Sequence, residues 1–305
     1  MPYGRAICYS GYRKGQSPIE KIYPSYEQIK EDLLLLKDHF SYIRMYDPST
    51  HAKTTLKVIR ENNIPLKVIL GADLVGEVNN PNCPWDKRVR SEEELKQNKE
   101  SNLNQIKELI KVANEYEDII VAVSCGNENT SSWNIRMVSV ESLVRYATLL
   151  KNETKHLVTF CEGPDGWINK LEKLVEVVDF ISVHSYPLWA RISLNDALVC
   201  NQKDYQNVKN KYLDKPIIFT ELGWTTKSNR VMNHEEVNEE NQFIYLKQLI
   251  NWLDKEQILG FIFEAFDEPW KGSDHEDEPE KHWGIFNEDR TPKKFMEYLL
   301  DIKNK

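Results

Sequence analysis

Two glutamates stand where apolar runs of the sequence end, and a carboxylate in such a place needs a partner or a chemical role. Glu128 follows the apolar run Ile119–Ser124, and Glu221 follows the run Pro216–Thr220. Burying a carboxylate is costly unless it is paired, hydrogen-bonded or functional. Two facing carboxyl groups form the pair that cleaves glycosidic bonds, because one protonates the leaving oxygen while the other attacks as a nucleophile. For either glutamate alone, a structural ion pair is an equally good interpretation, so the prediction depends on both.

Aromatic residues follow the same apolar runs and favour a carbohydrate ligand. Six tryptophans lie in or beside the segments after the later runs: Trp133, Trp167, Trp189, Trp224, Trp270 and Trp283. Four tyrosines are expected on the same rim: Tyr9, Tyr12, Tyr46 and Tyr186. Sugar rings present flat C–H faces that pack on indole rings, while polar neighbours bind the hydroxyl groups. Trp252 lies within a helical pattern instead, and we interpret it as a core residue.

The charge and hydropathy of the chain exclude several other ligands. Its 305 residues include 40 Lys and Arg against 48 Asp and Glu, so the net charge is −8. Such a protein repels phosphate backbones and anionic lipid surfaces, and no nucleic-acid partner is expected. The densest apolar run, Ile258–Phe266, is interrupted by Gly260 and Glu264, so the sequence predicts no membrane span.

Motifs for metal, nucleotide and disulfide chemistry are absent from the sequence. The five cysteines are scattered singly without a Cys-x-x-Cys pair, which disfavours a zinc cage or a disulfide framework. There is no His-Glu-x-x-His, Gly-x-Ser-x-Gly or Walker-type motif. The acidic segment Asp274–Glu278 lacks the ligand spacing of a calcium loop, and we interpret it as a solvated loop. We therefore expect neither a metal nor a cofactor.

The elements that must position these residues alternate along the chain. Nearly continuous apolar runs are typical of parallel strands buried on both faces. They are Arg5–Tyr9, Tyr42–Tyr46, Leu66–Leu70, Ile119–Ser124, Leu157–Cys161, Phe180–His184, Pro216–Thr220 and Gly260–Phe266. Amphipathic helical patterns separate the runs. These patterns are Tyr26–Phe40, Thr54–Asn62, Glu92–Glu117, Val140–Asn152, Lys170–Val177, Asp196–Tyr212, Glu235–Lys255 and Lys294–Ile302.

This alternation predicts a single-domain (β/α)8 TIM barrel over residues 1–305. An open Rossmann sheet is disfavoured because no Gly-x-Gly-x-x-Gly follows any strand. In a barrel of this kind, catalytic groups gather where the carboxyl ends of the strands open into loops. Polar and aromatic residues do follow the predicted strands, at Arg44–Pro48, Ser124–Asn129, Cys161–Gly163, His184–Pro187, Thr220–Trp224 and Glu264–Lys271.

Four of these segments together resemble glycoside hydrolase family 17, a (β/α)8 family of retaining β-1,3-glucanases and related glucanosyltransferases. They are Arg-Met-Tyr-Asp-Pro (44–48), Gly-Asn-Glu (126–128), Glu-Leu-Gly-Trp (221–224) and Phe-Glu-Ala-Phe-Asp-Glu-Pro-Trp-Lys (263–271). The resemblance extends to His-Trp-Gly-Ile-Phe (282–286) and so covers almost the whole chain. Trp224 precedes Thr225-Thr226 where plant members have Pro-Ser, which points to the microbial branch.

The resemblance implies roles for individual residues. Glu128 corresponds to the acid/base and Glu221 to the nucleophile, while Asn127 would bind the sugar 2-hydroxyl and Tyr46 would donate to the nucleophile. The substrate-binding residues expected in this way are Tyr46, Asn127, Glu162, His184, Tyr186, Trp224, Glu264, Glu268, Trp270, Lys271, Glu280 and Trp283. Among them, Glu268, Lys271 and Glu280 match a carboxylate–ammonium–carboxylate group that binds glucose hydroxyls. Charge compensation within an acidic loop explains Lys271 equally well, and a core role is the alternative for His184.

The sequence is therefore interpreted as a monomeric retaining glycosidase that cleaves laminarin-type β-1,3-glucan, with endo action expected. Retention requires the Glu128 and Glu221 carboxyls to lie about 5–5.5 Å apart. A glucanosyltransferase, which passes the sugar to a carbohydrate acceptor, remains an alternative, and so does a non-catalytic glucan-binding barrel. The segment Met1–Arg5 lacks the basic and apolar parts of a secretion leader. A secreted or periplasmic location would need a leader outside this chain.

Overall fold

Eight parallel strands close into a barrel in the computed structural model, which describes residues 1–303. The strands are β1 (Ala6–Cys8), β2 (Tyr42–Met45), β3 (Lys67–Leu70), β4 (Ile120–Asn127), β5 (Leu157–Glu162), β6 (Ile181–Ser185), β7 (Ile217–Leu222) and β8 (Gly260–Ile262). Each strand pairs with its sequence neighbour, and β8 pairs with β1 through Phe261 and Ala6 to close the ring. The predicted (β/α)8 barrel is therefore confirmed.

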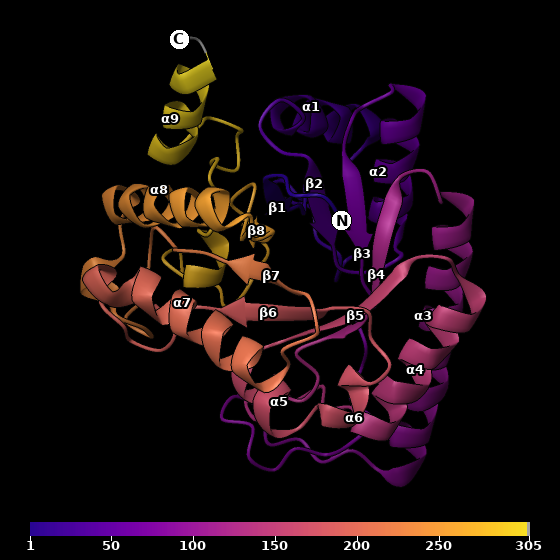
Figure 1. Ribbon diagram of the computed structural model, residues 1–305. Helices are drawn as coiled ribbons and strands as arrows, with labels where there is room; N and C mark the ends of the chain where they lie inside the picture. The colour runs from indigo at the N-terminus through magenta and orange to yellow at the C-terminus, as the bar shows by residue number, and fades with distance from the viewer. Residues whose placement is uncertain (304–305) are drawn as a thin grey trace.

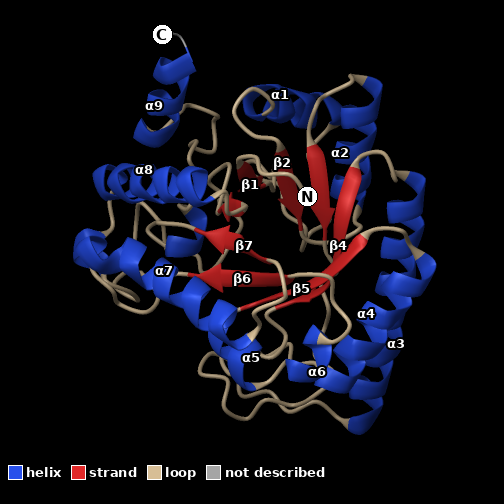
Figure 2. Cartoon of the chain, viewed as in Figure 1, coloured by secondary structure: helices blue, strands red, loops and turns tan. Residues whose placement is uncertain are grey.

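Helices surround the strands on all sides (Figures 1 and 2). They are α1 (Tyr26–Leu36), α2 (Thr50–Glu61), α3 (Glu92–Glu115), α4 (Val140–Glu153), α5 (Pro164–Asn169), α6 (Glu172–Val175), α7 (Leu194–Lys211), α8 (Glu239–Glu256) and α9 (Lys294–Lys303). Two 3₁₀ turns, η1 (His234–Glu236) and η2 (Pro279–Lys281), lie in the loops before α8 and α9. Within residues 1–303, none of the helices combines the length and apolar character that crossing a bilayer requires.

Most element boundaries follow from capping chemistry. Ser25 accepts from the backbone N–H of Gln28, whose side chain accepts from the Ser25 N–H, so a full capping box starts α1. Ser91 accepts from the Glu94 N–H at the start of α3, as its spacing predicted. The last predicted strand is too long, because β8 ends at Ile262. Phe266 bridges to Phe286 instead, outside the barrel.

The carboxyl ends of β4, β6 and β7 are irregular. Register shifts interrupt the pairing between Ser124 and Asn127 on β4, and similar shifts occur on β6 and β7. Such bulges redirect side chains and are frequent beside active sites. Glycine is needed after β7, since a Cβ on Gly223 would lie 2.3 Å from the carbonyl oxygen of Phe263. These ends of the barrel are thus shaped to turn polar side chains toward the mouth.

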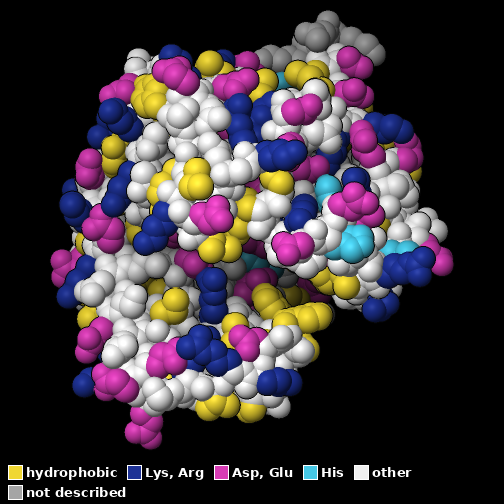
Figure 3. Space-filling model, turned by 180° about the vertical axis from the view of Figure 1, so that it is seen from behind, with side chains coloured by type: hydrophobic (Ala, Val, Ile, Leu, Met, Phe, Trp, Pro, Cys, Tyr) yellow, Lys and Arg dark blue, Asp and Glu magenta, His cyan; other side chains and the backbone are white. Residues whose placement is uncertain are grey.

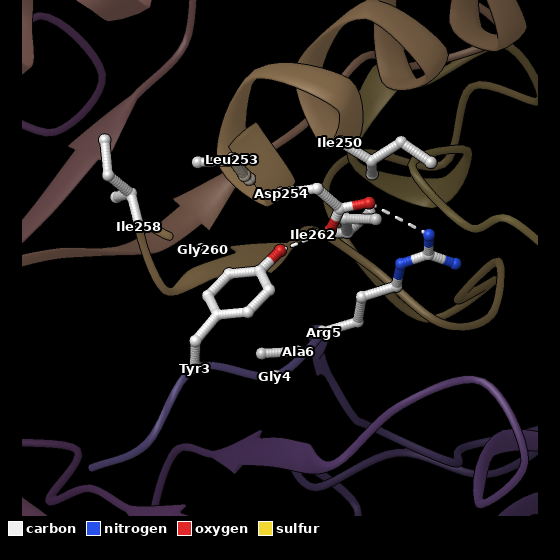
Figure 4. Close-up of a pocket in the computed structure, with 10 residues that line it drawn as sticks. All are labelled: Tyr3, Gly4, Arg5, Ala6, Ile250, Leu253, Asp254, Ile258, Gly260 and Ile262. Atoms are coloured by element: carbon white, nitrogen blue, oxygen red, sulfur yellow. Dashed lines mark hydrogen bonds and ion pairs between the residues drawn. The ribbon is translucent and has the colours of Figure 1, made fainter. Parts of the chain in front are cut away.

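The opposite, amino-terminal end of the barrel is closed. A cavity of about 10 Å³ lies there between the start of β1 and α8, with room for a single water at most (Figure 4). Asp254 of α8 accepts hydrogen bonds from Tyr3 and Arg5 at its edge, and the Arg5 contact is 3.0 Å. This cavity is a packing gap far from the polar strand ends, so the site must be sought at the other end.

Candidate active site

Glu221, near the end of β7, is a carboxylate at the barrel mouth that accepts several hydrogen bonds. Its side chain is only 7% exposed. Oε1 accepts from Arg44 and, at 2.9 Å, from the Tyr46 hydroxyl, while Oε2 accepts from the Tyr186 hydroxyl at 2.6 Å. Burial raises the pKa of this carboxyl, but the charges of His184 and Arg44 outweigh that effect and hold it at about 2. Glu221 is therefore ionised and fixed in orientation.

Glu128, directly after β4, has the opposite electrostatic character. It has a φ of 53°, a left-handed conformation that is uncommon for a residue other than glycine and is found at functional sites. Its side chain is 19% exposed and therefore reaches solvent. Burial of its carboxyl raises the pKa of Glu128, and the neighbouring Glu221 raises it further against the effect of His184. A carboxyl with a raised pKa is suited to donate a proton.

His184, on β6, lies between these two glutamates. Its Nδ1 is 2.9 Å from Oε1 of Glu128 and 3.3 Å from Oε2 of Glu221. Burial lowers the pKa of an imidazole, yet the two carboxyls raise that of His184 to about 10, so the ring carries a positive charge at neutral pH. Its side chain is 1% exposed. The ring is therefore covered and faces the two carboxyls, and its expected sugar contact stays a prediction.

The two carboxyls lie close together at the barrel mouth. One oxygen from each glutamate and a nitrogen of His184 all lie within 4.8 Å of one another. Carboxyls that retain configuration are about 5–5.5 Å apart, whereas inverting pairs need about 6.5–9.5 Å. The same three ligand atoms form a set that a metal ion accepts. However, the charges of His184 and Arg44 already balance two carboxylates, which favours proton transfer over metal binding.

Arg44, on β2, is a site residue that the sequence analysis did not single out. Its guanidinium donates to both Glu221 and Oδ1 of Asn127, and it lies 4.4 Å from the centre of the Tyr46 ring. Because arginine only donates, Oδ1 of Asn127 is occupied and its amide N–H groups remain available for a sugar hydroxyl. The signal for Arg44 was present in the sequence, since a cation inside a buried apolar strand requires an anionic partner.

Glu162, at the end of β5, supports the loop that follows Glu128. It is fully buried and accepts from the Thr130 amide at 3.0 Å, the Thr130 hydroxyl at 2.7 Å and the Ser131 hydroxyl at 2.6 Å. These contacts use both carboxylate oxygens. Glu162 therefore supports the loop that follows Glu128, and its expected role in substrate binding stays a prediction.

A buried acidic pair follows β8 under a lysine. Lys271 donates to Glu264 at 2.7 Å and lies 2.8 Å from Oε1 of Glu268, while Ser10 and Trp270 donate to the other oxygen of Glu268. Burial and the adjacent Glu268 raise the pKa of Glu264, whereas Lys271 outweighs burial and lowers that of Glu268. Glu264 and Glu268 are buried and Lys271 and Trp270 are partly buried, and substrate binding by these residues stays a prediction.

Glu280, on η2, adds a third carboxyl near the mouth. Burial raises its pKa to about 7, with Glu221 and Glu128 acting in the same direction and Lys271 against them. The side chain is half-buried and is therefore available to a ligand.

The tryptophans divide into two groups. Trp167, Trp224 and Trp283 are buried, and their expected sugar contacts stay predictions. The Trp167 indole donates to the Ser182 carbonyl and that of Trp224 to the Glu236 carbonyl, while Trp283 packs 5.2 Å from the Tyr186 ring. Exposed or half-buried indoles remain at Trp133, Trp189 and Trp270. Tyr9 and Tyr12 are also buried and do not belong to an exposed rim, whereas Trp252 packs in the core as predicted.

The surface opposite the view of Figure 1 is hollowed by a groove (Figure 3). Acidic side chains lie inside it, and hydrophobic side chains gather along one of its lips (Figure 3). An open groove with acidic groups at its floor suits an extended neutral ligand that is held by apolar contacts and cleaved by carboxyls.

Comparison with known proteins identifies relatives of this chain. The sequence profile of the BtgE/BtgC glycoside hydrolase domain matches residues 6–284. A glucan 1,3-beta-glucosidase of Arthroderma benhamiae is 23% identical over 190 residues, which cover 58% of this chain and 61% of that protein. A probable glucan endo-1,3-beta-glucosidase, btgC, of Aspergillus flavus is 26% identical over 227 residues, or 64% of this chain and 32% of the relative. The matched region therefore spans less than two thirds of either relative.

Solved structures share the fold over nearly the whole chain. An endo-laminarinase from Formosa Hel1_33_131 superposes with a TM-score of 0.83 and 24% identity, covering 98% of this chain and 87% of that one. A glycoside hydrolase family 17 β-1,3-glucanosyltransferase from Rhizomucor miehei has a TM-score of 0.73 and 19% identity, covering 95% of each chain. These structures show the shared fold, and the profile match over residues 6–284 confirms the family resemblance noted in the sequence motifs.

Proposed function

This chain belongs to the family of BtgE/BtgC glycoside hydrolase domains, and from that premise we propose that it cleaves laminarin-type β-1,3-glucan internally with retention of configuration. The observation that carries the proposal is the pair formed by Glu128 and Glu221, with ligand oxygens within 4.8 Å and pKa values shifted in opposite directions. The relatives named as glucan 1,3-beta-glucosidase, glucan endo-1,3-beta-glucosidase and endo-laminarinase support the substrate class.

In the first step, Glu128 donates its proton to the glycosidic oxygen as the bond from that oxygen to the anomeric carbon breaks. A carboxylate oxygen of Glu221 bonds to the same carbon from the opposite face and forms a glycosyl ester. In this proposal Asn127 donates to the sugar 2-hydroxyl, a contact that strengthens in the transition state. The aglycone then leaves with the proton of Glu128.

In the second step, the carboxylate of Glu128 removes a proton from water, whose oxygen attacks the anomeric carbon. The ester bond breaks and returns Glu221 to its ionised form, so the sugar is released with its original configuration. His184 serves both steps, because its Nδ1 lies 2.9 Å from Glu128 and 3.3 Å from Glu221 and its positive charge balances either carboxylate. Negative charge thus moves from one carboxyl to the other while its counter-charge stays in place.

One chain supplies every group in this scheme, and we propose that a monomer is sufficient for activity. The presence of both Glu128 and Glu221 favours an enzyme over a non-catalytic glucan-binding barrel, since binding alone does not require an acid and a nucleophile. No cofactor enters either step, because proton transfer and nucleophilic attack are both performed by side chains.

Incubation with a linear β-1,3-glucan tests the proposed function. Sizing of the products over time is expected to give oligosaccharides of several lengths from the start, which indicates internal cleavage. Release of one small sugar alone would contradict endo action, and products longer than the input would assign the chain to the glucanosyltransferases. Intact polymer after prolonged incubation would overturn the enzyme and favour the binding barrel.

A further inference from the structure

Two loops form a joined wall beside Glu128. The loop of residues 71–91 links β3 to α3, and the loop of residues 128–139 links β4 to α4. Asn80 donates to the carbonyls of Ser132 and Asn134 at 2.7 and 2.9 Å, and the Cys83 thiol contacts the Trp133 carbonyl at 3.0 Å. The amides of residues 77 and 78 both donate to the carbonyl of residue 137. The wall is thus one hydrogen-bonded unit.

This wall presents large apolar side chains to solvent. Trp85 is 72% exposed and Trp133 is 45% exposed, and Val78 and Val89 on the same wall are exposed as well. The contact of the Cys83 thiol with the Trp133 carbonyl and the hydrogen bond from Asn80 to the Asn134 carbonyl hold these loops in place. Neither contact covers the indole rings. Single exposed apolar residues need no explanation, but a group of them on one rigid wall beside a cleft indicates a binding surface.

The arginines of the wall already have carboxylate partners. Arg88 lies 2.8 Å from Glu94, and Arg136 contacts both oxygens of Asp73 at 2.6 and 2.8 Å. Lys87 donates to the Pro81 carbonyl at 3.2 Å. An anionic polymer would have to displace these partners, whereas a neutral sugar chain needs only the apolar faces and nearby amide groups. The charge pattern therefore favours a neutral polysaccharide.

The wall is continuous with the proposed acid/base. Asn134 donates to the main-chain carbonyl of Glu128 at 2.9 Å, and Glu162 holds Thr130 and Ser131 from below. Trp133 therefore lies in the turn that fixes Glu128. The group that Glu128 protonates is the glycosidic oxygen, which leaves with the aglycone. A surface built on the Glu128 loop accordingly adjoins the leaving-group side of the scissile bond.

We propose that Trp85 and Trp133 form a stacking platform for glucose units of the leaving-group side of a β-1,3-glucan chain. The inference rests on the proposed function and adds to it a preference for long chains. The platform also affects the second step. A sugar held there after cleavage offers its hydroxyl to the glycosyl-enzyme, and Glu128 removes the proton of that hydroxyl as the ester bond to Glu221 breaks. Transfer to a saccharide then competes with transfer to water.

Kinetics of Trp85→Ala and Trp133→Ala on laminarin and laminaritriose test the platform. Each substitution is expected to raise KM for laminarin about tenfold, which is within the scale of one stacking contact. The effect on laminaritriose should be several-fold smaller, because a short substrate reaches less of the wall. At high oligosaccharide concentration, the ratio of transfer to hydrolysis products should fall in both variants.

Two further variants separate stacking from misfolding. Trp133→Phe keeps an aromatic face and should recover most of the loss, whereas Leu213→Ala removes a 69% exposed side chain far from the mouth and should change neither substrate. Wild-type KM for laminarin in both alanine variants would overturn the platform, and so would equal losses on laminarin and laminaritriose. Failure of the wild-type protein to cleave laminarin would instead overturn the proposed function.

Discussion

At the scale of single residues, the site sets two cations, Arg44 and His184, against two carboxyls, of which Glu221 is ionised. Arg44 and His184 neutralise Glu221, and they also balance the negative charge that Glu128 gains when it gives up its proton. All four side chains are largely removed from water. In a low-dielectric site, a fixed counter-charge stabilises a developing carboxylate more strongly than water does. The pKa values of the two glutamates differ because of their neighbours. Arg44 and two tyrosines donate hydrogen bonds to the carboxylate of Glu221.

Replacement of the nucleophile tests the assignment of Glu221. Glu221→Ala should lower turnover by at least about a thousandfold, because no group remains to form the ester. Azide should fill the vacated space and attack an activated β-glucoside from the nucleophile's face, giving an α-glucosyl azide that NMR identifies.

Glu128→Ala is the matched control for this experiment. In that variant Glu221 still forms the ester and azide attacks from the other face, so the product should be the β-glucosyl azide. If the two variants exchange their products, the acid/base and nucleophile assignments are reversed.

Removal of the imidazolium tests the role of His184 through the pH profile. The enzyme is active while Glu221 is ionised and Glu128 is protonated. Burial lowers the pKa of His184, but the two carboxyls outweigh that effect and raise it to about 10. The resulting positive charge lowers the pKa of both glutamates. In His184→Asn, both pKa values should rise. Both limbs of the kcat/KM profile should therefore move to higher pH.

His51→Asn is the control, since burial lowers the pKa of His51 to about 4 and its ring packs on Tyr9 and Tyr12. That variant should keep both limbs in their wild-type positions. A His184→Asn profile that changes only in height, with unmoved limbs, would show that His184 acts through packing alone.

These residue roles were only partly predictable from the sequence. Glu128 and Glu221 were identifiable because each ends an apolar run, and Tyr46 donates to Glu221 as the family resemblance implied. The contacts of His184 with the two carboxyls were not predicted, because nothing in a single strand reveals which side chains converge from other strands. Arg44 was missed for the same reason, as its partners lie on β4 and β7.

At the scale of elements, the strands were predictable and their irregular ends were not. Continuous β-branched runs indicated all eight strands because each is buried on both faces. The register shifts on β4, β6 and β7 depend on pairing with neighbouring strands, and the bridge of Phe266 to Phe286 shortens β8. The short helix α5 escaped detection because its six residues are too few for a periodic pattern.

A buried ion network joins α1 to the segment after β8, and Asp32 is its centre. Asp32 accepts from Arg290 at 2.7 and 2.8 Å, from Arg13 at 3.1 Å and from Tyr9 at 3.2 Å. Asp32→Ala leaves the Arg290 charge buried without its partner, so urea unfolding should give a loss of about 3–5 kcal/mol.

Glu31→Ala is the neighbouring control for the same measurement. Glu31 is 57% exposed and paired with Arg13, and an exposed pair of this kind contributes less than about 1 kcal/mol. Equal losses in the two variants would mean that the buried network does not hold the two segments together.

At the scale of the whole molecule, the closed barrel brings together residues that lie far apart in the chain. Glu128 and His184 are separated by 56 positions and Arg44 and Glu221 by 177, yet both pairs are in direct contact. The net charge of −8 does not attract anionic polymers, and the arginines of the outer wall already have carboxylate partners. The molecule as a whole is therefore suited to a neutral polymer.

The anomeric configuration of the first product tests the central claim most directly. Proton NMR of laminari-oligosaccharide hydrolysis, recorded before mutarotation, should show the β-anomer at the new reducing end, because two displacements at carboxyls this close restore the starting configuration. Initial appearance of the α-anomer would mean a single displacement by water, and Glu221 would then not be a nucleophile.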